Sequence, residues 1–176
     1  MRRPVDSGRL DEFLRELGVR AAKPTRVYLT GGATAVAFGW RKSTIDVDVK
    51  FEPESDEILR AVPELKEKLA INVELASPEL FIPELPGWRE RAIPIGTHGK
   101  LSAYHYDPYA QALAKIERGH ARDRGDVARM MQDGLVEPAR LKALFEEIAP
   151  RLYRYPAIDP ESFRRRLEEA LGSSAR

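Results

Sequence analysis

The amino-acid sequence predicts an α+β fold, in which a small mixed β-sheet is flanked by helices and followed by a helical C-terminal extension. Two observations predict it. Segments that alternate apolar and polar residues are interleaved with segments that repeat apolar residues at helical spacing, and after residue 136 only the helical pattern remains. We therefore expect a core over residues 1–136 and a helical extension over residues 137–176 that packs on it. An α/β sandwich of the same elements is the alternative.

The first half of the chain alternates helix and strand signals. An apolar face at helical spacing predicts the first helix, and Gly18 is placed to end it. Thr30-Gly31-Gly32 is a turn signal between a strand and a helix of small residues. The expected helices cover residues 7–17, 33–38 and 56–69, and the expected strands cover residues 26–29, 45–51 and 71–76.

The second half begins with an irregular stretch at residues 77–87 and two expected strands at 92–95 and 100–106, joined by a turn at 96–99. Asp107-Pro108 opens a helix in the usual order of cap and proline. Two further helices are expected after residue 137. Asp159-Pro160 caps the second of them, and Gly172 is expected to end it.

The amino-acid composition excludes several classes of protein and site. The chain carries 29 basic and 28 acidic residues, so no overall basic excess calls for a nucleic-acid partner. It contains no cysteine, which excludes disulfides, thiolate metal sites and a cysteine nucleophile. No apolar stretch is long enough to cross a membrane and no signal peptide is visible, so we expect a cytoplasmic protein with no membrane partner.

The most informative residues are two aspartates on one expected strand. Asp46 and Asp48 are two residues apart, so they project from the same face of the strand. Two neighbouring carboxylates repel each other unless a cation compensates them, and Mg²⁺ prefers carboxylates together with substrate phosphates. The alternative is a surface strand that carries two aspartates by chance. Metal binding is favoured because aspartate is a poor strand former.

Gly31 and Gly32 precede this strand. Paired glycines let a backbone approach a ligand closely, and the first N–H groups of a following helix can hold an anion. Such a pair by itself is usually only a turn.

With Gly31-Gly32, thirteen intervening residues and Asp46-Val47-Asp48, the chain resembles the nucleotidyltransferase superfamily related to DNA polymerase β. Two surrounding segments, residues 30–35 and 41–48, are similar to small bacterial members, including the AbiEii-like toxins. Downstream, Lys115 and the segment from Arg122 to Val127 resemble the lysine and Arg-Asp-x-x-Asp helix of that branch. The matches extend from about residue 27 to about residue 131.

The resemblance implies a two-metal phosphoryl transfer, with Mg²⁺ or Mn²⁺ as cofactor and a nucleoside triphosphate as substrate. Asp46 and Asp48 would hold the metals. The superfamily usually adds a third carboxylate from a later strand, commonly aspartate, and Glu74 is the residue here that fits as a third catalytic and metal-binding residue. A solvated strand face explains Glu74 equally well, because alternation alone would expose it.

Nucleotide-binding roles fall to Gly31 and Gly32 and to several polar side chains. Ser43 and Thr44 could donate hydrogen bonds to a phosphate, or could simply begin the strand. Arg41 and Lys42 could bind the triphosphate through their charges, although cationic side chains on loops are usually just solvated.

Lys115 and Asp123 are also expected at the nucleotide. The lysine lies in an apolar helical run, where its ammonium needs a partner: the triphosphate or Asp123. In an unbroken helix Lys115 would share a stripe with Asp126, but Gly119 and Gly125 are potential helix breaks.

Two functions follow. The first is a metal-dependent enzyme that transfers a nucleoside monophosphate from a triphosphate to a hydroxyl of RNA (a tRNA end, for example), of a protein or of a small molecule. The AbiEii-like resemblance implies that it could be the toxin of a toxin–antitoxin pair, with a cognate antitoxin as partner. The second is a catalytically inactive module that binds a nucleotide or a partner with the same fold. The histidines lack the spacing of a zinc site, and no P-loop is present.

Overall fold

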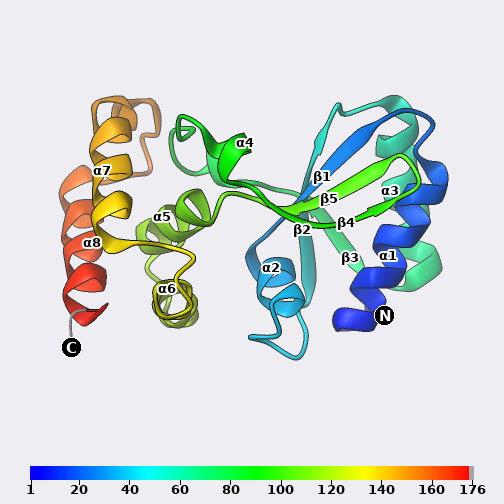
Figure 1. Cartoon of the computed structure of the whole chain (residues 1–176), viewed down its shortest axis with the longest axis horizontal. Helices are drawn as coiled ribbons and strands as arrows, with labels where there is room; N and C mark the ends of the chain where they lie inside the picture. Colours follow the sequence, from blue (N-terminus) through cyan, green and yellow to red (C-terminus); the bar gives the residue numbers. More distant parts are fainter. Residues whose placement is uncertain (175–176) are drawn as a thin grey trace. The chain divides into compact units, whose positions relative to one another are not determined.

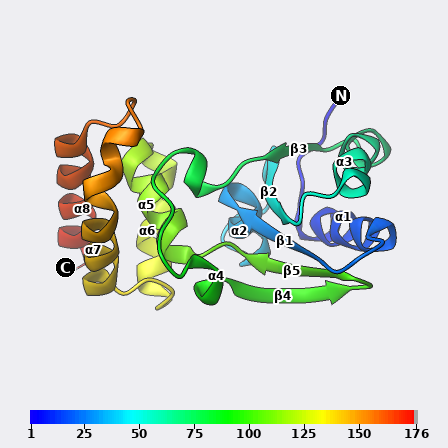
Figure 2. The same cartoon turned by 90° about the horizontal axis from the view of Figure 1, so that it is seen from above.

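Five strands form one mixed sheet in the order β3-β2-β1-β5-β4 in the computed structural model, which describes residues 1–174 (Figures 1 and 2). This sheet and its flanking helices confirm the predicted α+β class. The chain divides into two compact units. The first comprises Met1–Ser77 and Ala92–Tyr106, and the second comprises Pro78–Arg91 and the chain from Asp107 onward.

The first unit contains the whole sheet and three helices. Its elements are α1 (Ser7–Arg20), β1 (Thr25–Thr30), α2 (Gly31–Ala37), β2 (Asp46–Glu52), α3 (Asp56–Leu69), β3 (Asn72–Leu75), β4 (Ile93–His98) and β5 (Leu101–His105). Strand β1 pairs antiparallel with β2 and parallel with β5, while β2 pairs parallel with β3. Strands β4 and β5 form an antiparallel hairpin.

The core of this unit lies between one face of the sheet and its helices. Val27 and Leu29 of β1 and Val47 and Val49 of β2 are fully buried against apolar residues of α1, α2 and α3. Figure 1 shows α1 and α3 lying beside each other, as their packing requires. Because strand side chains alternate, the residues between these valines and leucines project from the opposite face of the sheet.

The second unit is helical. It contains two 3₁₀ segments, η1 (Pro78–Leu80) and η2 (Ala149–Arg154), and the helices α4 (Trp88–Arg91), α5 (Pro108–Arg118), α6 (Ala121–Gln132), α7 (Pro138–Ile148) and α8 (Pro160–Ser174). Asp107 caps α5 by accepting a hydrogen bond from the Tyr109 amide at 3.0 Å, as the Asp-Pro signal predicts. Helices α5 and α6 group with α7 and α8, whereas the sequence predicted a division after residue 136.

Several glycines behave differently from the sequence-based expectation. Gly18 does not end α1, which continues to Arg20, because its missing side chain serves close packing: a Cβ there would lie 2.4 Å from the His98 carbonyl oxygen. Gly119, at φ 73°, does end α5, so the unbroken helix considered above does not form. Gly125 lies within α6 and does not interrupt it, and α8 continues through Gly172.

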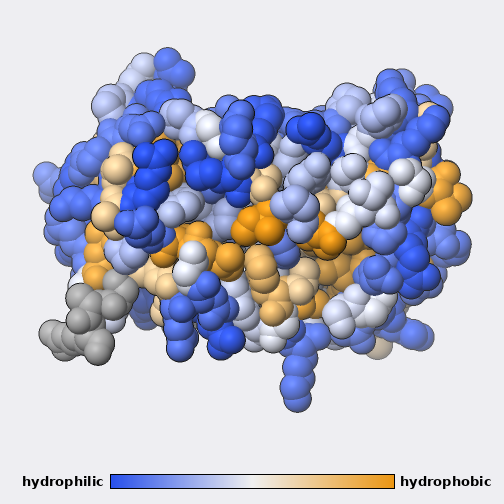
Figure 3. Space-filling model, viewed as in Figure 1, coloured by the Kyte–Doolittle hydropathy of each residue, from blue (hydrophilic) through white to orange (hydrophobic). Residues whose placement is uncertain are grey.

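The bounds of most other predicted strands and helices agree closely with the structure. The largest difference in a predicted element is β4, which extends to His98 through the expected turn and leaves only Gly99 and Lys100 between the paired ends of the hairpin. Gly31 and Gly32, expected as a turn, are the first residues of α2, and α4 and α6 were not predicted as separate helices. No helix in residues 1–174 is long and apolar enough to cross a membrane. Hydrophilic residues dominate the face shown in Figure 3, in keeping with a chain in which 32% of residues are charged.

Candidate functional site

Asp46 and Asp48 project from the face of β2 opposite the valines of the core. Both aspartates are half-buried, whereas Val47 and Val49 are completely buried. Strand pairing fixes their neighbours, since Asp48 lies opposite Thr30 of β1 and beside Glu74 of β3. The predicted sharing of one strand face is therefore present, and both neighbouring strands hold it in register.

The Gly31 backbone lies directly against the second aspartate. Gly31 has φ 58°, a left-handed conformation that glycine adopts readily, and a Cβ built on it would lie 2.8 Å from Asp48 Oδ2. The glycine therefore leaves space beside the carboxylate that any other residue would fill. This close approach also explains why a Gly-Gly pair precedes the aspartate strand in the sequence.

Asn72 and Glu74 of β3 complete the polar face. Asn72 Nδ2 donates hydrogen bonds to Asp46 Oδ1 at 2.6 Å and to Glu74 Oε1 at 3.2 Å. The amide therefore orients the first aspartate and links it to the exposed Glu74. Asn72 was missed in the sequence analysis, although the spacing Asn72-x-Glu74 repeats that of Asp46-x-Asp48 and could have indicated it.

The loop between α2 and β2 closes over the glycine pair. The Thr44 hydroxyl donates to the Asp46 carbonyl oxygen at 3.0 Å, and a Cβ on Gly32 would lie only 2.2 Å from that hydroxyl oxygen. Arg41 Nη1 lies 3.6 Å from the same Cβ position, so its guanidinium is beside the glycine pair that begins α2. Ser43 is exposed. Of the predicted phosphate ligands, Thr44 therefore already donates its hydroxyl hydrogen to the backbone of Asp46, and Arg41 lies close to Gly32.

The donor set fits a hard divalent cation. Asp46 and Asp48 offer carboxylate oxygens from one strand face, and Gly31 leaves space next to Asp48. Within residues 1–174, no three acidic or histidine side chains converge into a complete metal cluster. Two protein carboxylates suffice for Mg²⁺ when phosphates and water supply its other ligands.

Trp40 of the loop between α2 and β2 belongs to a stack of three aromatic rings that the sequence did not predict. The Phe38 ring lies between His105 and Trp40, with centroid distances of 3.9 Å and 4.8 Å and interplanar angles of 11° and 15°. The Thr34 hydroxyl donates to the Leu29 carbonyl, which leaves its oxygen to accept a hydrogen bond from His105 Nδ1 at 3.2 Å. Burial lowers the pKa of His105 to about 4, so the ring is neutral near pH 7.

In the helical unit, Lys115 has two carboxylate partners. Its Nζ lies 2.8 Å from Asp126 Oδ2 and 3.4 Å from Asp123 Oδ1, and all three side chains are buried. Asp123 also accepts hydrogen bonds from Arg118 at 2.7 and 2.8 Å. Burial raises the pKa of Asp123, but Arg118 and Lys115 outweigh that effect and hold the pKa below its ordinary value. Asp123, which the sequence offered as one partner of Lys115, is therefore joined by Asp126.

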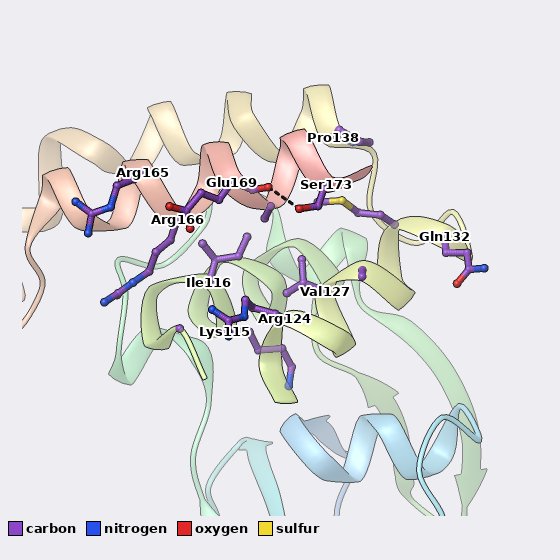
Figure 4. A pocket seen from close by; sticks show the side chains of 14 residues that line it. Lys115, Ile116, Arg124, Val127, Gln132, Pro138, Arg165, Arg166, Glu169 and Ser173 are labelled. Carbon is purple, nitrogen blue, oxygen red and sulfur yellow. Dashed lines mark hydrogen bonds between the residues drawn. The ribbon is translucent and has the colours of Figure 1, made fainter. Parts of the chain in front are cut away.

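A cavity of about 650 Å³ lies within the helical unit (Figure 4). Arg165, Arg166 and Glu169 come from α8, and Arg124 comes from α6. Lys115 contributes to the lining as well. Every lining residue belongs to the helical unit, so neither aspartate of β2 is among them.

The mixed sheet, with paired aspartates on one strand beside the glycine pair that begins α2, has the organisation of a nucleotidyltransferase-like α+β protein. The model of a family described as a nucleotidyltransferase of unknown function (DUF6036) matches residues 8–158, and the chain belongs to this family. No curated protein and no solved structure matches the chain. The nucleotidyltransferase class is thereby supported, and the AbiEii-like branch stays a prediction.

Proposed function

We propose that the chain transfers a nucleoside monophosphate from a nucleoside triphosphate to a hydroxyl acceptor, with Mg²⁺ or Mn²⁺ held by Asp46 and Asp48. The observation that carries the proposal is the pair of half-buried carboxylates on one face of β2, with the Gly31 backbone against the second. Membership in a nucleotidyltransferase family supports the same class of reaction.

In this transfer the acceptor oxygen bonds to the α-phosphorus of the triphosphate. The bond from that phosphorus to the oxygen that bridges to the β-phosphate breaks, and pyrophosphate leaves with the bonding electrons. When bound, a cation held by Asp46 and Asp48 would neutralise charge on the phosphate oxygens and orient them. Asn72 keeps the Asp46 carboxylate in position, and the Arg41 guanidinium beside Gly32 is placed to attract a phosphate.

Glu74 is assigned to the acceptor side of the reaction. It is exposed on β3 in register with Asp48, and Asn72 links its carboxylate to Asp46. A carboxylate there can accept the proton that the acceptor hydroxyl loses. The acceptor is the hydroxyl of an RNA such as tRNA, of a protein or of a small molecule. The similarity to AbiEii-like toxins supports a toxin that acts with a cognate antitoxin.

Nucleotide binding with and without metal tests the site. Titration of ATP, GTP, CTP and UTP in the presence of Mg²⁺ or Mn²⁺ should show metal-dependent binding to the wild-type protein. The Asp46→Asn, Asp48→Asn double variant should weaken it by more than about 100-fold, since even residues that only support metal ligands typically contribute 10–100-fold. Asp11→Asn, on the surface of α1, is the matched control. Unchanged affinity in the double variant would refute the site.

A further inference from the structure

The ring stack of His105, Phe38 and Trp40 has a fixed inner end. His105 is only 5% exposed, lies on β5 and shares a hydrogen bond with Thr34 of α2. Phe38 and Trp40 are both half-buried, and Trp40 belongs to the loop between α2 and β2. The stack therefore includes a partly exposed tryptophan ring that packs on Phe38.

The same loop connects this ring to the proposed phosphate site. Trp40 is followed directly by Arg41, whose guanidinium lies beside Gly32. Further along the same loop, the Thr44 hydroxyl donates a hydrogen bond to the Asp46 carbonyl oxygen. The amides of Trp40 and Arg41 both donate to the Ala35 carbonyl oxygen, at 2.9 and 3.3 Å, which fixes the loop on the end of α2. One short, anchored segment thus carries an aromatic ring and a cation beside the glycine pair that begins α2.

We propose that Trp40 is the base-binding platform of this enzyme, on which the nucleobase of the substrate triphosphate stacks. The inference rests on the proposed function and extends it, because it assigns recognition of the base to the loop between the glycine pair and the aspartates. A ring already stacked on Phe38 loses little freedom when a base joins the stack, so the platform is organised before the nucleotide binds. Every base has an aromatic face, so stacking accepts all four nucleotides, and the larger purines gain more from it.

Tryptophan fluorescence gives a direct readout. The chain has only two tryptophans, and the other one, Trp88, is 1% exposed. With Mg²⁺ present, ATP and GTP should quench the emission strongly and UTP more weakly. Inorganic tripolyphosphate, which carries the phosphates without a base, should leave it nearly unchanged. Trp40→Phe retains Trp88 as the only tryptophan, and its tryptophan emission should no longer be quenched.

Affinity measured by calorimetry provides the second readout. Trp40→Leu should weaken ATP binding by about 5- to 150-fold and leave tripolyphosphate binding unchanged, since stacking contributes only where a base is present. Trp40→Phe, which keeps an aromatic face, should retain most of the ATP affinity. Circular dichroism confirms folding of each variant, and the Asp46→Asn, Asp48→Asn protein should lose affinity for ATP and tripolyphosphate alike.

The outcomes separate the platform from the proposed function. If metal-dependent ATP binding requires the aspartates but Trp40→Leu binds ATP as the wild type does, the platform is wrong and the proposed function stands. Equal losses for ATP and tripolyphosphate in Trp40→Leu would likewise overturn the platform, because they would mean that Trp40 only shapes the loop. If the wild-type protein binds no nucleotide with either metal, both ideas fail.

Discussion

Asn72 and Glu74 show how single residues on a neighbouring strand can define the environment of the aspartate pair. The Asn72 amide holds one carboxylate oxygen of Asp46 and one of Glu74, so the three side chains form a connected polar row on one sheet face. Such supporting contacts commonly orient metal-binding carboxylates. Glu74 is exposed at the end of this row, where an acceptor can reach it.

Glu74→Gln should separate binding from chemistry. The variant keeps the shape of the side chain but cannot accept a proton, so turnover should fall by about 100-fold or more while triphosphate affinity stays nearly unchanged. Steady-state rates and nucleotide affinity are measured on the same protein, with Glu12→Gln on the exposed face of α1 as control. Wild-type turnover would return Glu74 to the role of a solvated strand residue.

His105 makes stability depend on pH. Its pKa is about 4 in the folded protein against 6.5 in an unfolded chain, because burial disfavours the charged ring. The unfolded state therefore binds more protons between these values. The contribution of the neutral His105 ring to the free energy of unfolding is therefore complete above pH 6.5. It is lost as the pH falls to about 4, and the total loss is about 3 kcal/mol.

The His105→Phe variant isolates this effect, since it keeps an aromatic ring in the stack but cannot titrate. Chemical denaturation between pH 7 and pH 4 should show a steeper fall in the free energy of unfolding for the wild type than for the variant. Parallel curves would mean that His105 is not the source of the pH dependence.

At the scale of elements, Gly18 shows why the sequence misplaced a helix end. A glycine after an apolar helical face is a common stop signal, but this one permits α1 to touch the backbone of β4. A local sequence pattern cannot predict packing between Gly18 and His98, which lie 80 residues apart in the chain. Of the two glycines that the sequence offered as breaks, Gly119 ends α5 with the positive φ that glycine adopts readily, whereas Gly125 lies inside α6.

Gly18→Ala should therefore destabilise the protein, although alanine favours helices. The propensity gain of about 1 kcal/mol is offset by a Cβ that would lie 2.4 Å from the His98 carbonyl oxygen, and overpacking of this kind typically costs about 1–3 kcal/mol. Gly8→Ala in the same helix is the control, because a Cβ there would lie at an ordinary 3.5 Å from its nearest neighbour, Asp6 Oδ1. Equal stability of both variants in chemical denaturation would contradict the close packing.

The junction of α5 and α6 depends on Lys115. Lys115→Met should leave Asp126 and Asp123 without their buried ammonium and lower the free energy of unfolding by about 3–5 kcal/mol. Adding Asp126→Asn should recover part of the loss, since it removes a buried charge. Arg129→Ala, which breaks an exposed pair with Asp133, should cost under about 1 kcal/mol.

Nucleotide affinity of the Lys115→Met variant provides a second test of the role of Lys115. If Lys115 is structural, the loss of nucleotide affinity in Lys115→Met should be similar for triphosphates and monophosphates. A variant as stable as Arg129→Ala would contradict the structural role. A selective loss of triphosphate affinity would instead indicate that Lys115 also meets the substrate.

At the scale of the whole molecule, the sequence predicted the α+β class, the order of the strands and the aspartate strand, because periodicity and alternation are local signals. It did not predict α4 or a separate α6. It did not predict how the segments divide into units. Pro78–Arg91 joins the helical unit although it lies between strands of the sheet unit, and only tertiary contacts determine that grouping. For the same reason Asn72 and the His105 stack were missed: their roles come from residues brought together across strands.

Transfer of label from a triphosphate tests most directly whether the aspartates of β2 support transfer of a nucleoside monophosphate. The protein is incubated with Mg²⁺ or Mn²⁺, cellular RNA, protein and small-molecule fractions, and triphosphates labelled at either the α- or the γ-phosphate. We expect covalent label in one fraction from the α-labelled nucleotide only, with pyrophosphate released, and a rate at least about 100-fold lower in Asp46→Asn, Asp48→Asn. Transfer of the γ-label, or equal transfer by the variant, would contradict it.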